Sequence, residues 1–423
     1  MDQRSTTGTH ADAMTLAGAT TEFEPDVMDL LVEALRNAVK WETPAVGTDT
    51  VLSALVMGDT DAGSVIAPGM RKSGGLSGII SGRAGRGWAS DDESGDAPAA
   101  TDADAREVDT AWREAQWRLG LRSRASVPRS DQARPGMTRA LRTSLLLAIG
   151  SARAEGTVSV RCRHVARALV DLPDSRSREA LLLRRLDPAA AATALDALAA
   201  GSPAQSEGPE SRGVMLLRRA GTLGKSGNPL SRAITSWTSG SGQYGSPVVF
   251  AVSVEAIRQA VRCGRTEAEP VDLLLGILSL DRALTVAGLS LPENLAAANA
   301  APALLRRHGV RQVPLTLAAV ASAPVPDIAD SSSVRRSAAV GRILAVAQLI
   351  AAEHGSPTVG TVHLLSAMLD EPTADAKAKA EANADADAGT EGEGEGEVVR
   401  ALRASGEVDM AALRAELRLG LGA

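Results

Sequence analysis

The spacing of hydrophobic residues predicts amphipathic helices along most of the chain. In the first such stretch, apolar side chains recur three and four residues apart, which places them on one face of a helix: Val27, Leu30, Leu31, Ala34, Leu35 and Ala38. A link at residues 43–47 follows, and its proline disfavours helical backbone at the residue before it. Thr48 can then serve as the N-cap of a second helix, whose apolar face is Val51, Leu52, Leu55 and Val56.

This two-helix phrase occurs four times, so the chain is predicted to be a helical repeat protein. The other copies cover residues 137–170, 252–278 and 334–365. Each pair is followed by a shorter phrase of an apolar helix, a Gly or Asp turn and another amphipathic helix, clearest at 398–417. In the first copy that phrase is degraded, and we expect its closing helix at the apolar stripe of residues 108–119. One helix pair cannot bury its own apolar face, so adjacent copies should pack in twos.

Composition divides these copies between two lobes, residues 22–200 and 248–423. Gly/Ser-rich composition indicates an insertion at about 73–103 and a flexible linker at 201–247. Residues 1–21 and about 373–396 have no means of burying a core, so they are expected to be a disordered tail and a low-complexity insertion. The predicted architecture is therefore all-α, with two tandem lobes that each contain a pseudo-two-fold pair of four-helix repeats.

Composition and charge narrow the class further. Phe, Trp and Tyr make up 2% of the 423 residues, which disfavours β-sandwiches and barrels. The formal charge is -6, but residues 370–397 hold ten acids and two lysines, so the rest is nearly neutral. We therefore expect no nucleic-acid or membrane partner. Two cysteines, Cys162 and Cys263, and no apolar run near the roughly 20 residues of a membrane span predict a cytoplasmic protein.

Two segments resemble a known repeat. Residues 43–55 (TPAVGTDTVLSAL) and 355–369 (GSPTVGTVHLLSAML) are similar to the repeat of the N-terminal domain of Clp unfoldases, whose signature is Gly-His-x-Tyr-Val-Gly-Thr-Glu-His-Leu-Leu. Residues 398–417 resemble the closing helices of that family, and the likeness covers about two thirds of the chain. In the family, two repeats make one compact helical domain that binds adaptors and substrate polypeptides. The resemblance implies two such domains in tandem.

The function implied by the resemblance is non-catalytic protein binding. The implied partners are components of the Clp protease system, adaptors or substrate polypeptides, with modulation of proteolysis as the result. The alternative is sequestration of small peptide ligands, such as antibiotics that target Clp N-terminal domains. We expect no enzyme activity and no cofactor, metal or nucleotide. The nearest phosphate-loop candidate, residues 219–226, has Arg219 where the first Gly belongs, and the five histidines show no metal or nucleophile spacing.

The resemblance also points to peptide-binding residues. In relatives that recognise phosphorylated arginine, the Glu after Val-Gly-Thr is implicated in holding the guanidinium. The aligned residues in the four copies are Asp49, Arg163, Val271 and Val362. One acid therefore survives, and Thr48 and Asp49 are the peptide-binding residues that the resemblance implies. The alternative for Asp49 is a first-turn acid that complements a helix N-terminus.

Three further side chains carry expectations. His363 occupies the histidine position of the family signature, and we expect it to make a structural hydrogen bond. Trp88 and Trp237 lie in Gly/Ser-rich segments, where a tryptophan is either an anchor that docks elsewhere or a residue of a loose tether.

Overall fold

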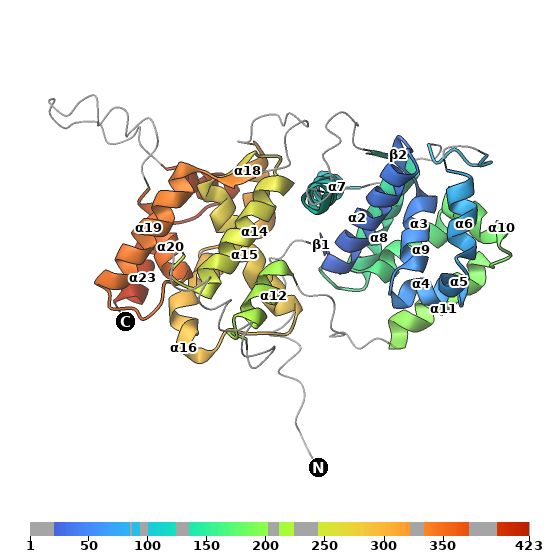
Figure 1. The fold of residues 1–423 in the computed structure, drawn as a ribbon. Helices are drawn as coiled ribbons and strands as arrows, with labels where there is room; N and C mark the ends of the chain where they lie inside the picture. Colours follow the sequence, from blue (N-terminus) through green and yellow to red (C-terminus); the bar gives the residue numbers. More distant parts are fainter. Residues whose placement is uncertain are drawn as a thin grey trace, which may run out of the picture. The chain divides into compact units, whose positions relative to one another are not determined.

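The computed structural model describes residues 21–84, 87–93, 100–123, 135–201, 211–223, 244–321, 334–371 and 396–422. These residues form 20 α-helices, one 3-10 helix and three two-stranded sheets (Figure 1). They belong to two compact units, an N-terminal unit within Thr21–Pro209 and a C-terminal unit within Glu210–Ala423. The prediction of a mainly helical protein is confirmed, whereas the small sheets were not predicted. The tail at 1–20 and the low-complexity residues 373–395 lie outside the described residues.

The N-terminal unit is built on two helix pairs that enclose one hydrophobic core. Helices α2 and α3 pack on each other, and so do α8 and α9. The apolar stripes predicted for the first two helices are buried in this core. The helices of the unit are α2 (Pro25–Lys40), α3 (Thr48–Met57), α4 (Asp61–Ile66), α5 (Met70–Ser73), α6 (Gly75–Gly82), α7 (Asp102–Ser123), α8 (Arg139–Ala154), α9 (Cys162–Asp171), α10 (Arg176–Leu183) and α11 (Pro188–Gly201).

Two short parallel sheets join the helix pairs of this unit. Strand β1 (Glu22–Phe23), which precedes α2, pairs with β4 (Ser159–Val160), which links α8 to α9. Strand β2 (Ala45–Val46), which links α2 to α3, pairs with β3 (Gly136–Met137), which precedes α8. The pairing is reciprocal: the entry segment of each helix pair lies against the link of the other pair.

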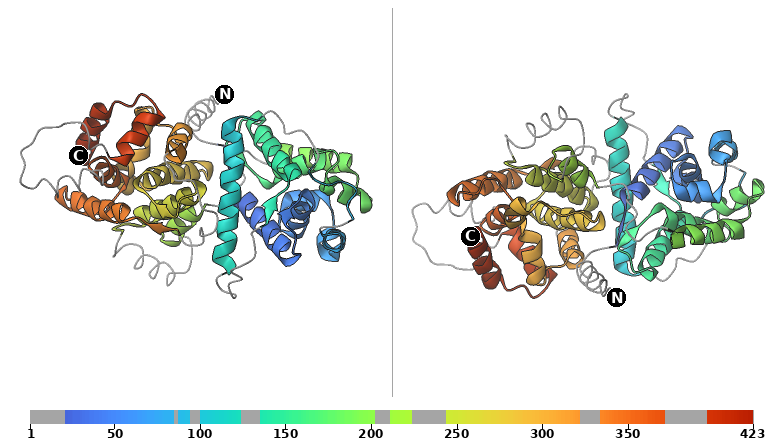
Figure 2. Two further views of the ribbon diagram at one scale, coloured as in Figure 1. Left: turned by 90° about the horizontal axis from the view of Figure 1, so that it is seen from above. Right: turned by 90° about the horizontal axis from the view of Figure 1, so that it is seen from below.

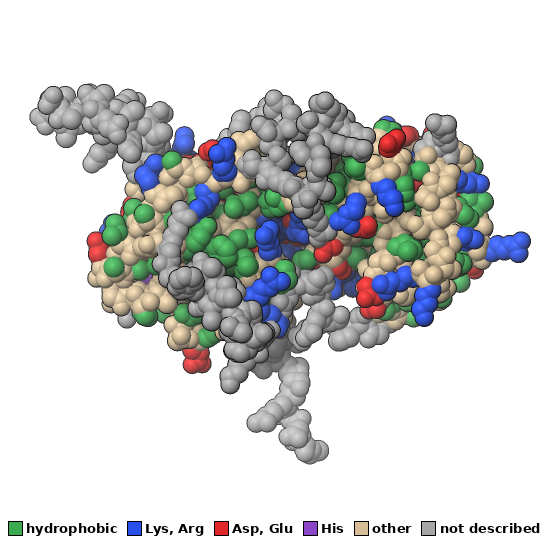
Figure 3. Space-filling model, viewed as in Figure 1, with side chains coloured by type: hydrophobic (Ala, Val, Ile, Leu, Met, Phe, Trp, Pro, Cys, Tyr) green, Lys and Arg blue, Asp and Glu red, His purple; other side chains and the backbone are tan. Residues whose placement is uncertain are grey.

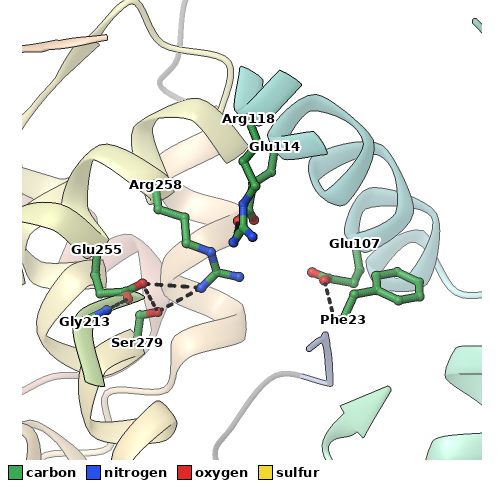
Figure 4. A network of polar contacts seen from close by, with 8 residues as sticks. All are labelled: Phe23, Glu107, Glu114, Arg118, Gly213, Glu255, Arg258 and Ser279. Carbon is green, nitrogen blue, oxygen red and sulfur yellow. Dashed lines mark hydrogen bonds and ion pairs between the residues drawn. The ribbon is translucent and has the colours of Figure 1, made fainter. Parts of the chain in front are cut away.

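One sequence-based expectation for this unit needs correction, and another is confirmed as a helix. The insertion expected at about 73–103 contains helix α6, whose Leu76 and Ile80 are buried in the core. Its high Gly and Ser content concealed that short apolar pattern. The stripe at 108–119 does form a helix, α7, but α7 packs against α2 and α8 (Figure 2). Glu107 on α7 also accepts a hydrogen bond from the backbone N–H of Phe23 in β1, at 3.4 Å (Figure 4).

The C-terminal unit has the same kind of core. Helix α14 packs on α15 and α19 packs on α20, while strand β5 (Glu267–Ala268) pairs in parallel with β6 (Arg335–Arg336). The helices of the unit are α12 (Arg212–Arg219), α14 (Pro247–Arg262), α15 (Pro270–Val286), α16 (Glu293–Ala296), the 3-10 helix η1 (Ala297–Asn299), α17 (Ala301–Arg307), α18 (Gln312–Ala321), α19 (Ala338–Glu353), α20 (Thr361–Leu369), α22 (Glu397–Ser405) and α23 (Met410–Leu421).

Helix α12 corrects the expectation that residues 201–247 are all flexible linker. Its Val214 and Leu217 are fully buried, and the helix packs against α14. Glu255 on α14 accepts hydrogen bonds from the backbone N–H of Gly213 at 3.2 Å and from Ser279 Oγ at 3.3 Å (Figure 4). Two turns of amphipathic helix are too short to stand out against the Gly/Ser/Pro-rich surroundings. Residues 202–210 and 224–243 lie outside the described residues.

The visible face of each unit is chemically mixed. On the faces shown in Figure 3, basic, acidic and hydrophobic side chains are interspersed over both units. Among the described helices, none has both the length and the apolar character needed to cross a bilayer.

Candidate functional site

The N-terminus of α3 is the place where the sequence puts its candidate binding residues. Helix α3 begins at Thr48, and its N-cap is Gly47, with extended backbone at φ -98° and ψ 174°. The expectation that Thr48 is the N-cap is therefore wrong by one residue. As the first helical residue, Thr48 has a hydroxyl that is free to bond across the structure, where it accepts the backbone N–H of Ser177 at 3.0 Å.

Asp92 closes this N-terminus from the side. Its carboxylate is completely buried. It accepts hydrogen bonds from the backbone N–H of Thr48 at 2.7 Å, from Thr48 Oγ1 at 2.8 Å, from the backbone N–H of Arg176 at 2.9 Å and from Thr138 Oγ1 at 3.2 Å. One carboxylate thus joins the beginnings of three helices, because Thr138 is the N-cap of α8 and Arg176 is the first residue of α10.

The electrostatics explain why an acid occupies this position. The first N–H groups of a helix have no partner within the helix, and the helix dipole favours negative charge there. Asp92 serves two such ends together, α3 and α10, and hydrogen bonds to an ionised acceptor are stronger than those between neutral groups. Its backbone has a φ of 59°, a left-handed conformation that Asp tolerates better than most residues.

The segment that carries Asp92 is tied down along its length. We name residues 87–93 the strap. Glu179 on α10 accepts the backbone N–H groups of Ala89 and Ser90 at 2.9 and 3.0 Å. Arg176 donates to the carbonyl oxygens of Ser90 and Asp91 at 3.3 and 2.7 Å. The strap is therefore held by charge-assisted hydrogen bonds from the first turn of α10.

Trp88 of the strap packs against the core of its own unit. It is partly buried there, and the Arg83 guanidinium carbon lies 5.6 Å from the centre of its ring. Such a cation–π contact stabilises the position of the ring in addition to the effect of its burial. Of the two tryptophans considered as anchors, Trp88 thus anchors the strap, and Trp237 lies outside the described residues.

Asp49 lies beside Asp92 and is almost as buried, with 4% of its surface exposed. Its Oδ1 has no hydrogen-bond partner. Burial first, and the neighbouring charge of Asp92 second, raise the pKa of the Asp49 carboxyl to about 6, against opposing effects of Arg176 and of backbone N–H groups. The two acids and Arg176 surround the point where a β-carbon on Gly47 would lie: Asp92 Oδ2 at 3.0 Å, Arg176 Nη1 at 3.4 Å and Asp49 Oδ1 closer still.

The structure therefore brings Thr48 and Asp49 together and adds Asp92 and Arg176 to them. Thr48 is fully buried and Asp49 nearly so. A polypeptide can contact either side chain only after the residues that cover it have moved. The site contains two carboxyls, one guanidinium and two helix N-termini, so it can form charge-assisted hydrogen bonds.

The other three phrase helices begin in related but different ways. At α9, the N–H of Cys162 donates to Asp26 Oδ2 at 3.3 Å. Helix α15 begins with Pro270, which has no N–H to satisfy. At α20, the N–H of Thr361 donates to the side-chain oxygen of Asn299 at 3.0 Å. In each case the first amide is either bonded to a side chain of the same unit or absent.

The residues aligned with Asp49 in the other copies do not form an acidic site. Arg163 is paired with Glu155 through two hydrogen bonds, and Val271 and Val362 are buried apolar side chains. The Nδ1 atom of His363 accepts the backbone N–H that precedes α20, at 2.9 Å. Its predicted structural hydrogen bond is confirmed.

A small cleft of about 240 Å³ is lined by residues of α8, α9 and α11 together with Glu155. Its two arginines already have carboxylate partners. Arg163 is paired with Glu155, and Arg167 is paired with Asp171 and Asp196. With both of its arginines already paired, this cleft is a weaker candidate than the N-terminus of α3. Within the described ranges, no group of three or more His, Cys, Asp or Glu side chains is placed to hold a metal ion.

No protein-family model, no curated protein and no solved structure matches this chain. The likeness to Clp N-terminal domains therefore rests on the sequence phrases quoted above.

Sequence reasoning missed Asp92 because it lies in a Gly/Ser/Asp-rich stretch whose composition predicts an insertion. A usable signal was present: Trp88 is followed within five residues by the acidic run Asp91, Asp92 and Glu93. A bulky aromatic residue beside a short acidic run is unusual in a loose tether, since tethers seldom contain large apolar side chains. The candidate phosphate loop at residues 219–226 begins at the last residue of α12, and residues 224–226 lie outside the described part.

Proposed function

We propose that this chain is a non-catalytic protein-binding module related to the N-terminal domains of Clp chaperones, with Clp-system components, adaptors or substrate polypeptides as its partners. The observation that carries the proposal is the fourfold helix–link–helix phrase, which recurs in the helix order of both units. The reciprocal pairing of β1 with β4 and of β2 with β3 supports it, because two related motifs that face each other exchange their edges in this way.

Within this proposal, the N-terminus of α3 is the binding site. Thr48 offers a hydroxyl and a backbone N–H, and Asp49 offers a carboxyl, but in the closed structure Asp92 already occupies the donors of Thr48. Binding of a polypeptide at these residues therefore includes displacement of the strap. The energy needed for displacement makes this unit selective, since only a partner that replaces those charge-assisted hydrogen bonds gains enough to bind.

The proposal is tested with the purified full chain. Binding to purified Clp chaperone subunits and their adaptors is measured by calorimetry, and affinity purification with mass spectrometry identifies further candidates for the same direct measurement. We expect saturable binding to at least one Clp-system component and no turnover in peptidase and ATPase assays. Absence of binding to every Clp component contradicts the proposal. Binding of cyclic peptide antibiotics alone favours sequestration instead.

A pair of matched variants locates the site. Thr48→Val removes a hydroxyl that hydrogen-bonds Asp92 and Ser177, whereas Thr361→Val removes the corresponding hydroxyl of α20, which has no partner. We expect Thr48→Val to change the affinity for the partner about tenfold or more, which corresponds to about 1.4 kcal/mol. Thr361→Val should leave the affinity within a factor of two. Equal effects of the two variants contradict a site at α3.

A further inference from the structure

Two buried carboxyls face each other where the strap meets α3. Asp49 lies on the first turn of α3, and Asp92 lies on the strap. Their oxygens Oδ1 and Oδ2 are both beside the α-carbon of Gly47, on the side where a β-carbon would project. A side chain at that position would occupy the space between them, and glycine leaves it free.

The groups that surround this pair carry too little positive charge to neutralise both acids. From α10 comes the guanidinium of Arg176, and the two hydroxyls that donate to Asp92, those of Thr48 and Thr138, are uncharged. Two of the three nitrogens of Arg176 are already used by strap carbonyl oxygens. With both carboxyls ionised, the closed site therefore holds an excess negative charge in a place that water does not reach.

The hydrogen bonds show which acid can take a proton. Both oxygens of Asp92 accept from donors, two of which are backbone N–H groups that cannot reverse their role. These donors need an acceptor at both oxygens of Asp92. Asp49 Oδ1 has no hydrogen-bond partner, so a proton on this oxygen breaks no hydrogen bond there and removes the repulsion between the two acids.

We infer that the strap is a proton-linked latch over the N-terminus of α3, closed most firmly when Asp49 is protonated and loosened when both Asp49 and Asp92 are ionised. The latch controls access to Thr48. It is a property of the chain alone, so it holds whether or not the proposed partners are correct.

The direction of the pH dependence follows from the different pKa of Asp49 in the closed and the open state. In the closed state, burial and the charge of Asp92 raise the pKa of Asp49 to about 6, from an ordinary value of 3.8. Lifting the strap weakens both causes, so the pKa falls towards the ordinary value and closure takes up a proton. The ratio of closed to open molecules is therefore highest below about pH 4, decreases up to about pH 6 and levels off above that. The decrease is at most about a hundredfold, because each unit of pKa difference is a factor of ten.

Hydrogen exchange of the full chain tests the latch. The reporters are the backbone amides of Thr48 and Arg176, which donate to the Asp92 carboxylate, and of Ala140, which donates to the Asp92 carbonyl oxygen at 2.9 Å. Protection is measured between pH 4 and pH 7.5 and corrected for the intrinsic exchange rate at each pH. We expect protection of the three reporters to fall by tenfold to a hundredfold over this range.

Three variants make the test specific. Asp49→Asn keeps the shape of the side chain and removes its titration, so protection should become independent of pH within a factor of two. Asp92→Asn should lower the protection of Thr48 and Arg176 at every pH. Asp91→Asn makes the same charge change at an exposed strap residue and should keep the wild-type profile. The latch is overturned by a flat wild-type profile, by an Asp49→Asn profile that still falls, or by wild-type protection in Asp92→Asn.

Discussion

The beginnings of α3 and α20 are built from the same local sequence and closed by different chemistry. Both helices start with a Gly-Thr pair, Gly47 with Thr48 and Gly360 with Thr361. A carboxylate, Asp92, accepts the first N–H of α3, whereas the carboxamide oxygen of a neutral Asn299 accepts that of α20. Each closing residue comes from a segment outside the two-helix phrase.

The difference shows how a repeated helix start acquires a property of its own. At α20, the residue after the threonine is the buried Val362, and the closure contains no net charge. At α3, Asp49 and the closing carboxylate make the closure stronger in hydrogen bonds and also sensitive to protons. The dipole of α3 is complemented by the negative charge of Asp92, whereas the N-terminus of α20 has only the neutral acceptor Asn299.

The largest expected effect comes from removing the two closing side chains. Asp92→Ala leaves the N–H groups of Thr48 and Arg176 buried without a partner, and each such group costs about 1–3 kcal/mol. Relief of the repulsion on Asp49 offsets part of the loss. We expect a net loss of about 3 kcal/mol in the unfolding free energy of the N-terminal unit at pH 7. Asn299→Ala removes one neutral acceptor and should cost the C-terminal unit about 1 kcal/mol.

Urea unfolding separates the two results. Four of the five tryptophans, Trp41, Trp88, Trp112 and Trp117, belong to the N-terminal unit, so the fluorescence change follows mainly that unit, and circular dichroism follows both. Equal losses for Asp92→Ala and Asn299→Ala would show that the carboxylate adds nothing over the amide.

A smaller effect separates the two glycines. A β-carbon on Gly360 would overlap the backbone carbonyl oxygen of Ala298, which cannot move without shifting η1. On Gly47 its closest neighbour would be Oδ1 of Asp49, a side-chain oxygen that can rotate away, and Asp92 Oδ2 would lie at 3.0 Å. We expect Gly360→Ala to cost about 2 kcal/mol, in the range for overpacking, and Gly47→Ala to cost less than about 1 kcal/mol.

Thermal unfolding at pH 5 checks the order of the two alanine variants, because Asp49 is largely neutral there and the electrostatic part of the comparison is small. A larger loss for Gly47→Ala would mean that the two carboxyls are held as rigidly as backbone.

The smallest effect compares how the two units respond to pH. Burial raises the pKa of Glu397 on α22 to about 7; Arg265 opposes the rise, and Glu269 and Asp272 add to it. A raised folded-state pKa of an acid gives stability that is full below the unfolded value, about 4.5, and is lost as the pH rises through about 7. Glu397→Gln should therefore match the wild type at pH 4 and stabilise the C-terminal unit by about 1 kcal/mol at pH 8.

Urea unfolding at pH 4, 6 and 8 measures this difference. Because the pKa of Asp49 is about 6, the pH-dependent loss of stability of the N-terminal unit should be complete about one pH unit below that of the C-terminal unit. A Glu397→Gln variant that loses stability at pH 8 would show that the ionised side chain makes a favourable contact.

Much of the fold followed from periodicity, because helices with one buried face repeat their apolar residues at helical spacing. The stripes of α2 and α3, the phrase at 398–417 and the long helix at 108–119 all lie in helices of the structure. Two short helices, α6 and α12, escaped prediction because one or two turns contain too few apolar residues to establish a period. The β-pairings also escaped, since two-residue strands leave no alternating pattern.

The candidate site was predictable in part. Thr48 and Asp49 were found because they belong to a phrase with a recognisable order of residues. Asp92 and Arg176 were not, because they are 43 and 127 residues away from Asp49 along the chain. Only the folded packing of the strap and α10 places them at that helix end, and a single sequence does not encode such a distance in any local pattern.

The strand pairing between the two helix pairs of the N-terminal unit has a consequence for how that unit folds. Neither helix pair can form a sheet by itself, since β1 pairs with β4 and β2 pairs with β3, and more than ninety residues separate the two strands of each sheet. Contacts of such long range are formed late and slow folding down. During synthesis, the first helix pair therefore lacks its strand partners until the second pair has been made. If the folded chain is cut between the two pairs, the two fragments should remain bound to each other.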